Sequence, residues 1–256
     1  MFSHFANPER FERLARVVTP WAWGAAAVLF AIGLPWALVV SPPDYQQSET
    51  VRIMYVHVPS AWLAMAAYAG LGVSSFIYFI WRHNLADLAA RSLAPAGAVF
   101  AALCLATGAL WGRPMWGAWW VWDARLTSML VLLLLYLGYM ALRAAIEDEK
   151  LAARAGAILS MAGLINLPII KFSVDWWNTL HQPASVIRFD GPTIHASKLW
   201  PLTVMALAFT ALLTALVFST MRTLILERRA AALERRREQR LELEAAQALP
   251  DQGPAE

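Results

Sequence analysis

Long apolar runs alternate with short polar segments along the chain. A transmembrane helix needs roughly 20 consecutive apolar residues, and six runs reach or approach this length. They lie at residues 21–40, 58–80, 93–110, 126–142, 155–170 and 199–221, and the third and fifth are the short ones. Proline, arginine, lysine or aspartate stands near the ends of each run and marks its polar boundary. The pattern predicts an all-α integral membrane protein with six transmembrane helices.

Composition agrees with this prediction and excludes some functions. Hydrophobic residues make up 59% of the chain and charged residues 15%, whereas soluble domains average about 45–50% and about 25%. The interiors of the six runs contain no Asp, Glu, Lys, Arg or His. Ion-coupled transporters normally carry such groups, so a secondary transporter is disfavoured. No Gly-x-x-x-x-Gly-Lys-Ser/Thr motif occurs, which excludes a Walker-type ATPase in this polypeptide.

One predicted helix has a polar interruption. Asn166 and Pro168 lie within the fifth run. Two interpretations are open: a helix kink in which the amide is satisfied locally, or a residue pair that lines a cavity.

The distribution of Lys and Arg predicts the orientation. The N-terminal segment, the second and fourth loops and the tail from Arg222 carry fifteen of these residues, and the other three loops carry six. By the positive-inside rule, both termini are cytoplasmic. We therefore expect a membrane domain at residues 1–221 and a charged cytoplasmic extension at 222–256. The loop between the third and fourth helices then faces the opposite compartment.

That loop holds a cluster of tryptophans. Five of the thirteen in the chain are Trp111, Trp116, Trp119, Trp120 and Trp122. Indoles offer a large flat surface and one N–H donor, which suits a planar aromatic ligand. A membrane-interface belt is the simpler interpretation, but a belt decorates both interfaces. Ten tryptophans lie on or near the predicted outer side and three on the inner side, a bias that favours a ligand surface.

Histidines near the cluster are candidate metal ligands. His57 precedes the second run, His181 follows the fifth and His195 precedes the sixth. Neutral imidazoles can take both axial positions of a haem iron while indoles pack on the macrocycle. Resident b-type haems are generally held within helices, whereas these histidines lie at helix ends, which favours haem handling over electron storage. The single cysteine and the absence of Cys-x-x-Cys-His exclude c-type thioether attachment.

Local patterns give further expectations for the loop. Asp123 is predicted to cap the fourth helix, and Arg125 to form a local ion pair with it. Gly112, Pro114 and Gly117 are expected to break or bend the first half of the cluster. If the second half is helical, one face carries Trp116, Trp119, Trp120 and Asp123. Haem propionates would seek cations, and those predicted on the outer side are Arg52, Arg113, Arg125, Lys171 and Arg188.

Three blocks resemble those of a known family. Residues 111–125 resemble the tryptophan-rich WWD signature of haem-handling proteins. The segment RIMYVHVPSAW at 52–62 is similar to the histidine block that precedes it, and residues 166–183, ending FSVDWWNTLHQP, resemble a third block. In order and spacing the blocks resemble the family of cytochrome c maturation protein C (CcmC, haem exporter protein C) over roughly residues 17–221.

The resemblance implies a site and a function. It selects His57 and His181, rather than His195, as axial ligands of the iron of a non-covalent haem b. The other cofactor-binding residues would be Trp111, Trp116, Trp119, Trp120, Trp122, Asp123, Arg52 and Arg125. The site would lie at the periplasmic face of the bacterial inner membrane and present haem to a periplasmic chaperone, maturation protein E.

Other partners and functions follow from the same resemblance. An ATP-binding cassette pair (maturation proteins A and B), a small single-span maturation protein D and membrane lipid are the expected partners, with no nucleic acid. Whether loading of the chaperone is a haem-lyase-like enzymatic step is left open. Two alternatives are a resident bis-histidine electron-transfer subunit and a transmembrane haem transporter.

Overall fold

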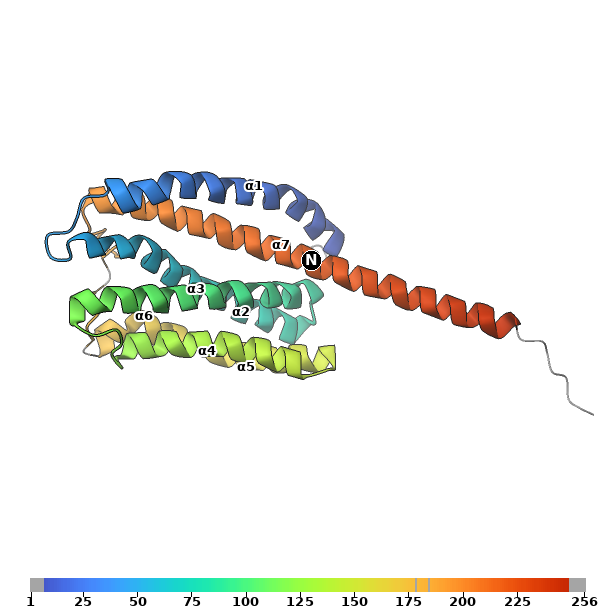
Figure 1. Ribbon diagram of the computed structural model, residues 1–256. Helices are drawn as coiled ribbons and strands as arrows, with labels where there is room; N and C mark the ends of the chain where they lie inside the picture. The colour runs from blue at the N-terminus through green and yellow to red at the C-terminus, as the bar shows by residue number, and fades with distance from the viewer. Residues whose placement is uncertain (1–6, 178, 184, 249–256) are drawn as a thin grey trace, which may run out of the picture.

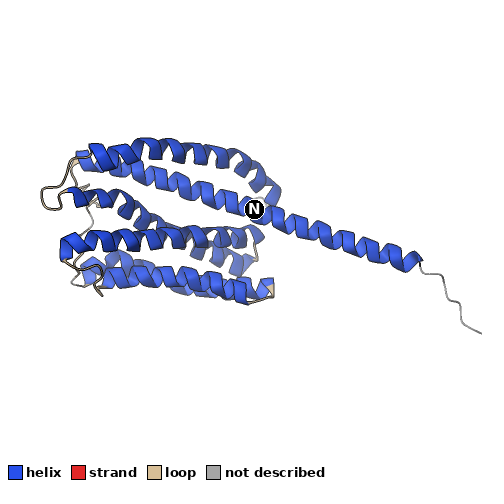
Figure 2. Ribbon diagram, in the orientation of Figure 1, coloured by secondary structure: helices blue, strands red, loops and turns tan. Residues whose placement is uncertain are grey.

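The computed structural model describes residues 7–177, 179–183 and 185–248. In these residues every regular element is helical (Figure 2). Asn178 of the third family-like block and residues 249–256 of the predicted extension lie outside the described residues. Six helical segments are long and apolar enough to cross a membrane: Pro8–Val40, Glu49–Trp81, Asn84–Trp116, Ala124–Ala145, Glu149–Trp176 and Ala196–Glu242. The prediction of an all-α fold with six spans is confirmed.

The helices form layers along one common direction. Their bounds are α1 Pro8–Pro35, a π-helical turn Trp36–Val40, a 3-10 turn Glu49–Ile53, α2 Met54–Trp81, α3 Asn84–Trp116, α4 Ala124–Ala145, α5 Glu149–Gly163, α6 Asn166–Trp176 and α7 Ala196–Ala248. α1 lies along α7, which packs on α2 and α3, and α4, α5 and α6 cover the other side of that pair (Figure 1). α3 is therefore a central element of the bundle.

Both ends of the described chain lie on one side of the bundle. The start of α1 and the free part of α7 are at one end, and the connections α1–α2, α3–α4 and α6–α7 are at the other (Figure 1). We call the latter the tryptophan end, because the α3–α4 connection carries the tryptophan cluster. α7 continues past Met221 without a break, so the division between residues 221 and 222 stays a prediction from composition.

The fifth span is discontinuous at its polar interruption. α5 ends at Gly163 and α6 begins at Asn166, which is buried. The Asn166 amide donates to the carbonyl of Ser128 in α4 at 2.9 Å. A buried amide without a partner would cost free energy in an apolar surrounding, so this contact supports a break at which the amide is satisfied, with its partner on a neighbouring helix rather than within its own.

Ion pairs join four helices at the end opposite the tryptophans. Asp87 of α3 is only 4% exposed and pairs with Arg143 of α4 and Arg228 of α7. Arg228 also contacts Glu149 of α5 at 2.7 Å, and Arg91 reaches the same carboxylate at 3.4 Å. Pairing compensates the cost of burying the Asp87 charge. The network thus holds α3, α4, α5 and α7 together.

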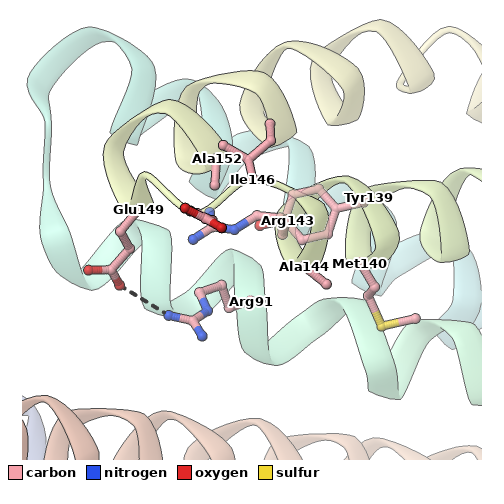
Figure 3. Close-up of a pocket in the computed structure, with 9 residues that line it drawn as sticks. Arg91, Tyr139, Met140, Arg143, Ala144, Ile146, Glu149 and Ala152 are labelled. Atoms are coloured by element: carbon pink, nitrogen blue, oxygen red, sulfur yellow. Dashed lines mark hydrogen bonds and ion pairs between the residues drawn. The ribbon is translucent and has the colours of Figure 1, made fainter.

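A cavity of about 350 Å³ lies beside this network. Arg91, Arg143 and Glu149 line it together with Tyr139 and Ala152 (Figure 3). Arg91 precedes Trp111 by twenty residues in the same helix, which corresponds to roughly 30 Å at 1.5 Å per residue. This cavity is therefore separate from the tryptophan cluster.

Close packing between α3 and α4 gives a stability prediction. Tyr136 is fully buried, donates to the carbonyl of Ala64 at 2.7 Å and lies where a Cβ at Gly97 would stand. Gly97→Ala should destabilise the protein by about 1–3 kcal/mol, the usual cost of overpacking. Gly24→Ala, where nothing lies within 4 Å, is the control. Thermal unfolding in detergent measures both, and equal midpoints would contradict the prediction.

Candidate functional site

The tryptophan cluster begins in a helix and ends outside one. α3 continues through Trp111 to Trp116, and Gly117 closes it with a φ of 76° and an N–H that returns to the carbonyl of Arg113 at 3.1 Å. Glycine is the residue that adopts this left-handed conformation most readily at a helix end. The following segment, residues 118–123, is not helical. The cluster therefore changes conformation at Gly117.

The expected break falls at Gly117, whereas Gly112 and Pro114 lie within α3, and the condition that the second half is helical is not met. The first half is helical because Pro114 stands in the last turn of α3, where a missing N–H costs a single hydrogen bond. The second half is not helical, because Asp123 is the extended residue that caps α4. Trp119 and Trp120 consequently do not share a helix face with Trp116.

His57 lies in the first turn of α2 and packs on α3. Its Nδ1 is 3.0 Å from the carbonyl oxygen of Cys104 and 3.1 Å from the hydroxyl of Thr107. Its ring meets the indole of Trp111 edge-on, with centroids 5.6 Å apart. The position of His57 at the start of the second membrane-spanning helix agrees with the sequence prediction. The sequence did not predict the contacts of His57 with Cys104 and Thr107. The only hint was that these two residues share helical spacing with Trp111.

His181 approaches the cluster from the α6–α7 connection. Its Nδ1 lies 3.2 Å from a carboxylate oxygen of Asp123, and its ring packs against Trp116 with centroids 4.9 Å apart. The other carboxylate oxygen of Asp123 accepts the N–H of Leu126 at 2.7 Å. The predicted cap is therefore confirmed, and the same carboxylate holds an imidazole.

The environment of His181 favours its neutral form. Burial lowers the pKa of His181 from its ordinary value of 6.5, and the hydrogen bond and charge of Asp123 oppose part of that shift. A neutral ring that donates from Nδ1 to a carboxylate keeps its lone pair on Nε2. In the part of the chain that the structure describes, Nε2 of neither His57 nor His181 has a hydrogen-bond partner.

Two indoles of the cluster are exposed. Trp119 is 56% exposed and Trp122 is 75% exposed. Trp120 meets Trp122 edge-on at 5.3 Å, and its buried indole N–H has no partner among the described residues. Trp111 instead donates its N–H to Gln47 of the α1–α2 connection at 3.1 Å. The cluster thus combines exposed indole rings with one buried indole N–H that has no partner among the described residues.

The candidate cations connect structural elements. Arg125 donates to the hydroxyl of Ser173 at 3.1 Å and to backbone carbonyls of α6. Among the ion pairs of the described residues none joins Arg125 to Asp123, so the expected local pair is wrong. Asp123 instead faces its own helix terminus and His181. Arg52 pairs with Glu49 at 2.6 Å and donates to the carbonyl of Leu38.

The third outer histidine is apart from this arrangement. His195 is exposed, and its Nδ1 lies 2.8 Å from the Ser197 hydroxyl at the start of α7. It has a local capping contact rather than a contact with the tryptophan cluster. The geometry therefore brings His57 and His181, and not His195, to the two ends of the Trp111–Trp116 stretch.

The donor set fits a haem. Two imidazoles from different elements each have Nδ1 engaged and Nε2 free, which is the arrangement of orienting contacts expected around a metal-binding histidine. The α3–α4 connection next to Trp116 carries the exposed indoles of Trp119 and Trp122. Axial imidazoles with aromatic packing on the macrocycle satisfy the bonding needs of a haem.

Titration of His181 provides a test of this geometry. In the haem-free protein its midpoint should lie below 6.5, and Asp123→Asn should lower it further, because the carboxylate is what opposes the effect of burial. Asn caps helices about as well as Asp, so α4 should persist. Imidazole NMR shifts as a function of pH measure the midpoint. An unchanged or higher value in the variant would contradict the Asp123–His181 contact.

Comparisons with known proteins place the chain in a family. A model described as "Heme exporter protein C" matches residues 1–236. The heme exporter protein C of Bradyrhizobium diazoefficiens is 55% identical over 229 residues, which cover 90% of this chain and 87% of that protein. The proteins of the same name from Escherichia coli K12 and Paracoccus denitrificans are 44% and 42% identical, covering 86% and 90% of this chain and 89% and 95% of their own lengths. The chain belongs to the heme exporter protein C family.

Proposed function

We propose that this protein binds haem b non-covalently at its tryptophan end and presents it to a periplasmic haem chaperone, maturation protein E, in cytochrome c biogenesis. Membership of the family supports a role in haem handling. The observation that carries the proposal is the pair His57 and His181, which flank one stretch of α3 and whose Nε2 atoms have no hydrogen-bond partner among the described residues.

The residues have separable roles in this proposal. His57 and His181 supply the two axial imidazoles, and haem supplies an iron that accepts them. Trp119 and Trp122 offer open faces for the macrocycle, while Trp111 and Trp116 hold the imidazole edges. The chain contributes orientation rather than bond chemistry, since fixed ligands set the plane in which one edge of the macrocycle faces an acceptor.

Propionates would be bound by donors around this surface. The N–H of Trp120 is buried and has no partner among the described residues, so its ring would have to turn outward to donate to a propionate. Arg52 and Arg125 are the proposed cations, because a guanidinium has five N–H donors and their contacts within the protein use only some of them. Asp123 acts through His181, whose ring it orients.

The location and partners belong to the same proposal. The protein is a multi-pass membrane protein, which we assign to the bacterial inner membrane with the tryptophan end in the periplasm. This assignment rests on the excess of Lys and Arg on the other side. The ATP-binding cassette pair A and B and the single-span protein D would complete the assembly within the lipid bilayer.

Removing either imidazole tests the ligand assignment. His57→Ala and His181→Ala should each change the axial-ligand absorption spectrum of the purified protein and reduce haem transfer to the chaperone. His195→Ala, at the exposed histidine near Ser197, is the matched control and should retain both. Unchanged spectra and haem occupancy in the first two variants would overturn the assignment. Haem that cycles reversibly but is never transferred would indicate a resident cytochrome instead.

The exposed indoles give a different prediction. The double variant Trp119→Leu/Trp122→Leu removes open aromatic faces that contact neither imidazole in the structure. We expect the absorption spectrum to keep its two-imidazole form while haem occupancy falls, because each aromatic contact contributes about 0.5–1.5 kcal/mol beyond its buried area. Titration with haemin measures the affinity. Equal affinity in the double variant would exclude these rings from the haem surface.

A further inference from the structure

One face of α3 surrounds the imidazole of His57. Cys104, Thr107, Gly108 and Trp111 follow each other at spacings of three, one and three residues, which places them on a single helix face. The Cys104 carbonyl and the Thr107 hydroxyl approach Nδ1 at 3.0 and 3.1 Å. Trp111 lies against the ring edge. We call Thr107, Gly108 and the Cys104 carbonyl the His57 cradle.

The hydrogen bonds of the cradle define which ring nitrogen carries the proton. The Thr107 hydroxyl donates its hydrogen to the carbonyl of Leu103 at 2.7 Å. Toward His57 it can therefore act only as an acceptor. The Cys104 carbonyl can only accept. Nδ1 therefore faces two acceptors and must be the protonated nitrogen, because tautomers follow from the hydrogen-bond network. The lone pair of a neutral ring is then on Nε2.

Gly108 provides the space for this ring position. A Cβ built on Gly108 would lie 3.1 Å from Cε1 of His57, and the nearest other atom would be Nδ1 of the same ring at 3.6 Å. The backbone of His57 is fixed within α2, and Trp111 packs against its ring. An alanine would therefore push the imidazole away from the two acceptors.

We propose that Thr107 and Gly108 are positioning residues that set the tautomer and direction of His57, so that Nε2 is presented to haem iron. The proposal rests on the proposed ligand role of His57. It also makes the two ligands inequivalent: neutral acceptors on a neighbouring helix hold His57, whereas a carboxylate holds His181 on a connecting segment. Orienting contacts of this kind tune ligand strength as well as direction.

The tautomer is measured first, in the full-length haem-free protein in detergent. Nitrogen NMR of labelled histidine should show His57 protonated at Nδ1, with His57→Gln used to assign its signals. Thr107→Val should raise the fraction protonated at Nε2, and Thr107→Ser should restore the native pattern. Thr203→Val is the matched control, because that part-buried hydroxyl also donates only to its own helix and contacts no histidine.

Haem binding is measured second. Thr107→Val should weaken haemin affinity about tenfold, the lower end of the usual effect of removing an orienting contact, because the Cys104 carbonyl remains. Its ferric electron paramagnetic resonance signals should also shift, and the reduction potential should rise as the ring donates less to iron. Thr107→Ser should reverse these changes. Gly108→Ala should lose more affinity than Gly138→Ala, where a Cβ would meet only Leu159 at 3.8 Å.

The outcomes separate this proposal from the proposed function. If His57→Ala alters the haem spectrum while Thr107→Val and Gly108→Ala match the wild type in tautomer, affinity and potential, the cradle is overturned and the ligand assignment stands. If His57→Ala leaves the haem spectrum unchanged, the ligand assignment fails, and with it the role proposed for the cradle. Should Gly108→Ala fail to fold, the Thr107→Val and Thr107→Ser pair still decides.

Discussion

The interior of a bilayer offers no hydrogen-bond partners, and this constraint underlies the whole structure. Backbone groups are satisfied within helices, and several buried side chains find partners on neighbouring helices. Asn166 donates to the Ser128 carbonyl, Tyr136 to that of Ala64, and Asp87 pairs with Arg143 and Arg228. Nδ1 of His57 follows the same rule when it meets acceptors on α3. In the proposed function, the contact that satisfies Nδ1 of His57 is also the one that orients the ring toward haem.

α3 links the bundle to the site. Its middle packs in the core, and its last two turns carry the Trp111 and Trp116 rings against His57 and His181. Asp123 then ends the cluster with a double role as helix cap and partner of His181. The capping hydrogen bond fixes the direction of the Asp123 carboxylate. The orientation of the His181 imidazole that contacts this carboxylate is therefore fixed as well. The site therefore depends on where α3 ends and α4 begins.

Much of this could be predicted from residue patterns, for identifiable reasons. Apolar run length predicted the six spans, and the cap preference of aspartate predicted the role of Asp123, since both are local properties. In the tryptophan cluster a break or bend was expected at Gly112, Pro114 and Gly117, and the helix ends only at Gly117, because α3 continues through Pro114. Arg125 was expected to pair with Asp123, yet it reaches Ser173 across to α6. Contacts between distant segments have no local pattern that would predict them.

The sequence by itself determined the membrane class, the number of spans and the supply of indoles and imidazoles, because length, hydropathy and residue chemistry are written along the chain. Only the tertiary structure shows the contacts that bring His57 and His181 to the cluster and engage Nδ1 of each ring, since in the sequence the choice of His181 over His195 rested on the family resemblance. His181 and His195 are alike in sequence as outer-side histidines, but only His181 reaches Asp123 and Trp116. Their difference arises from the path of the α6–α7 connection, and hydrogen bonds between segments far apart in sequence exist only once the helices have packed.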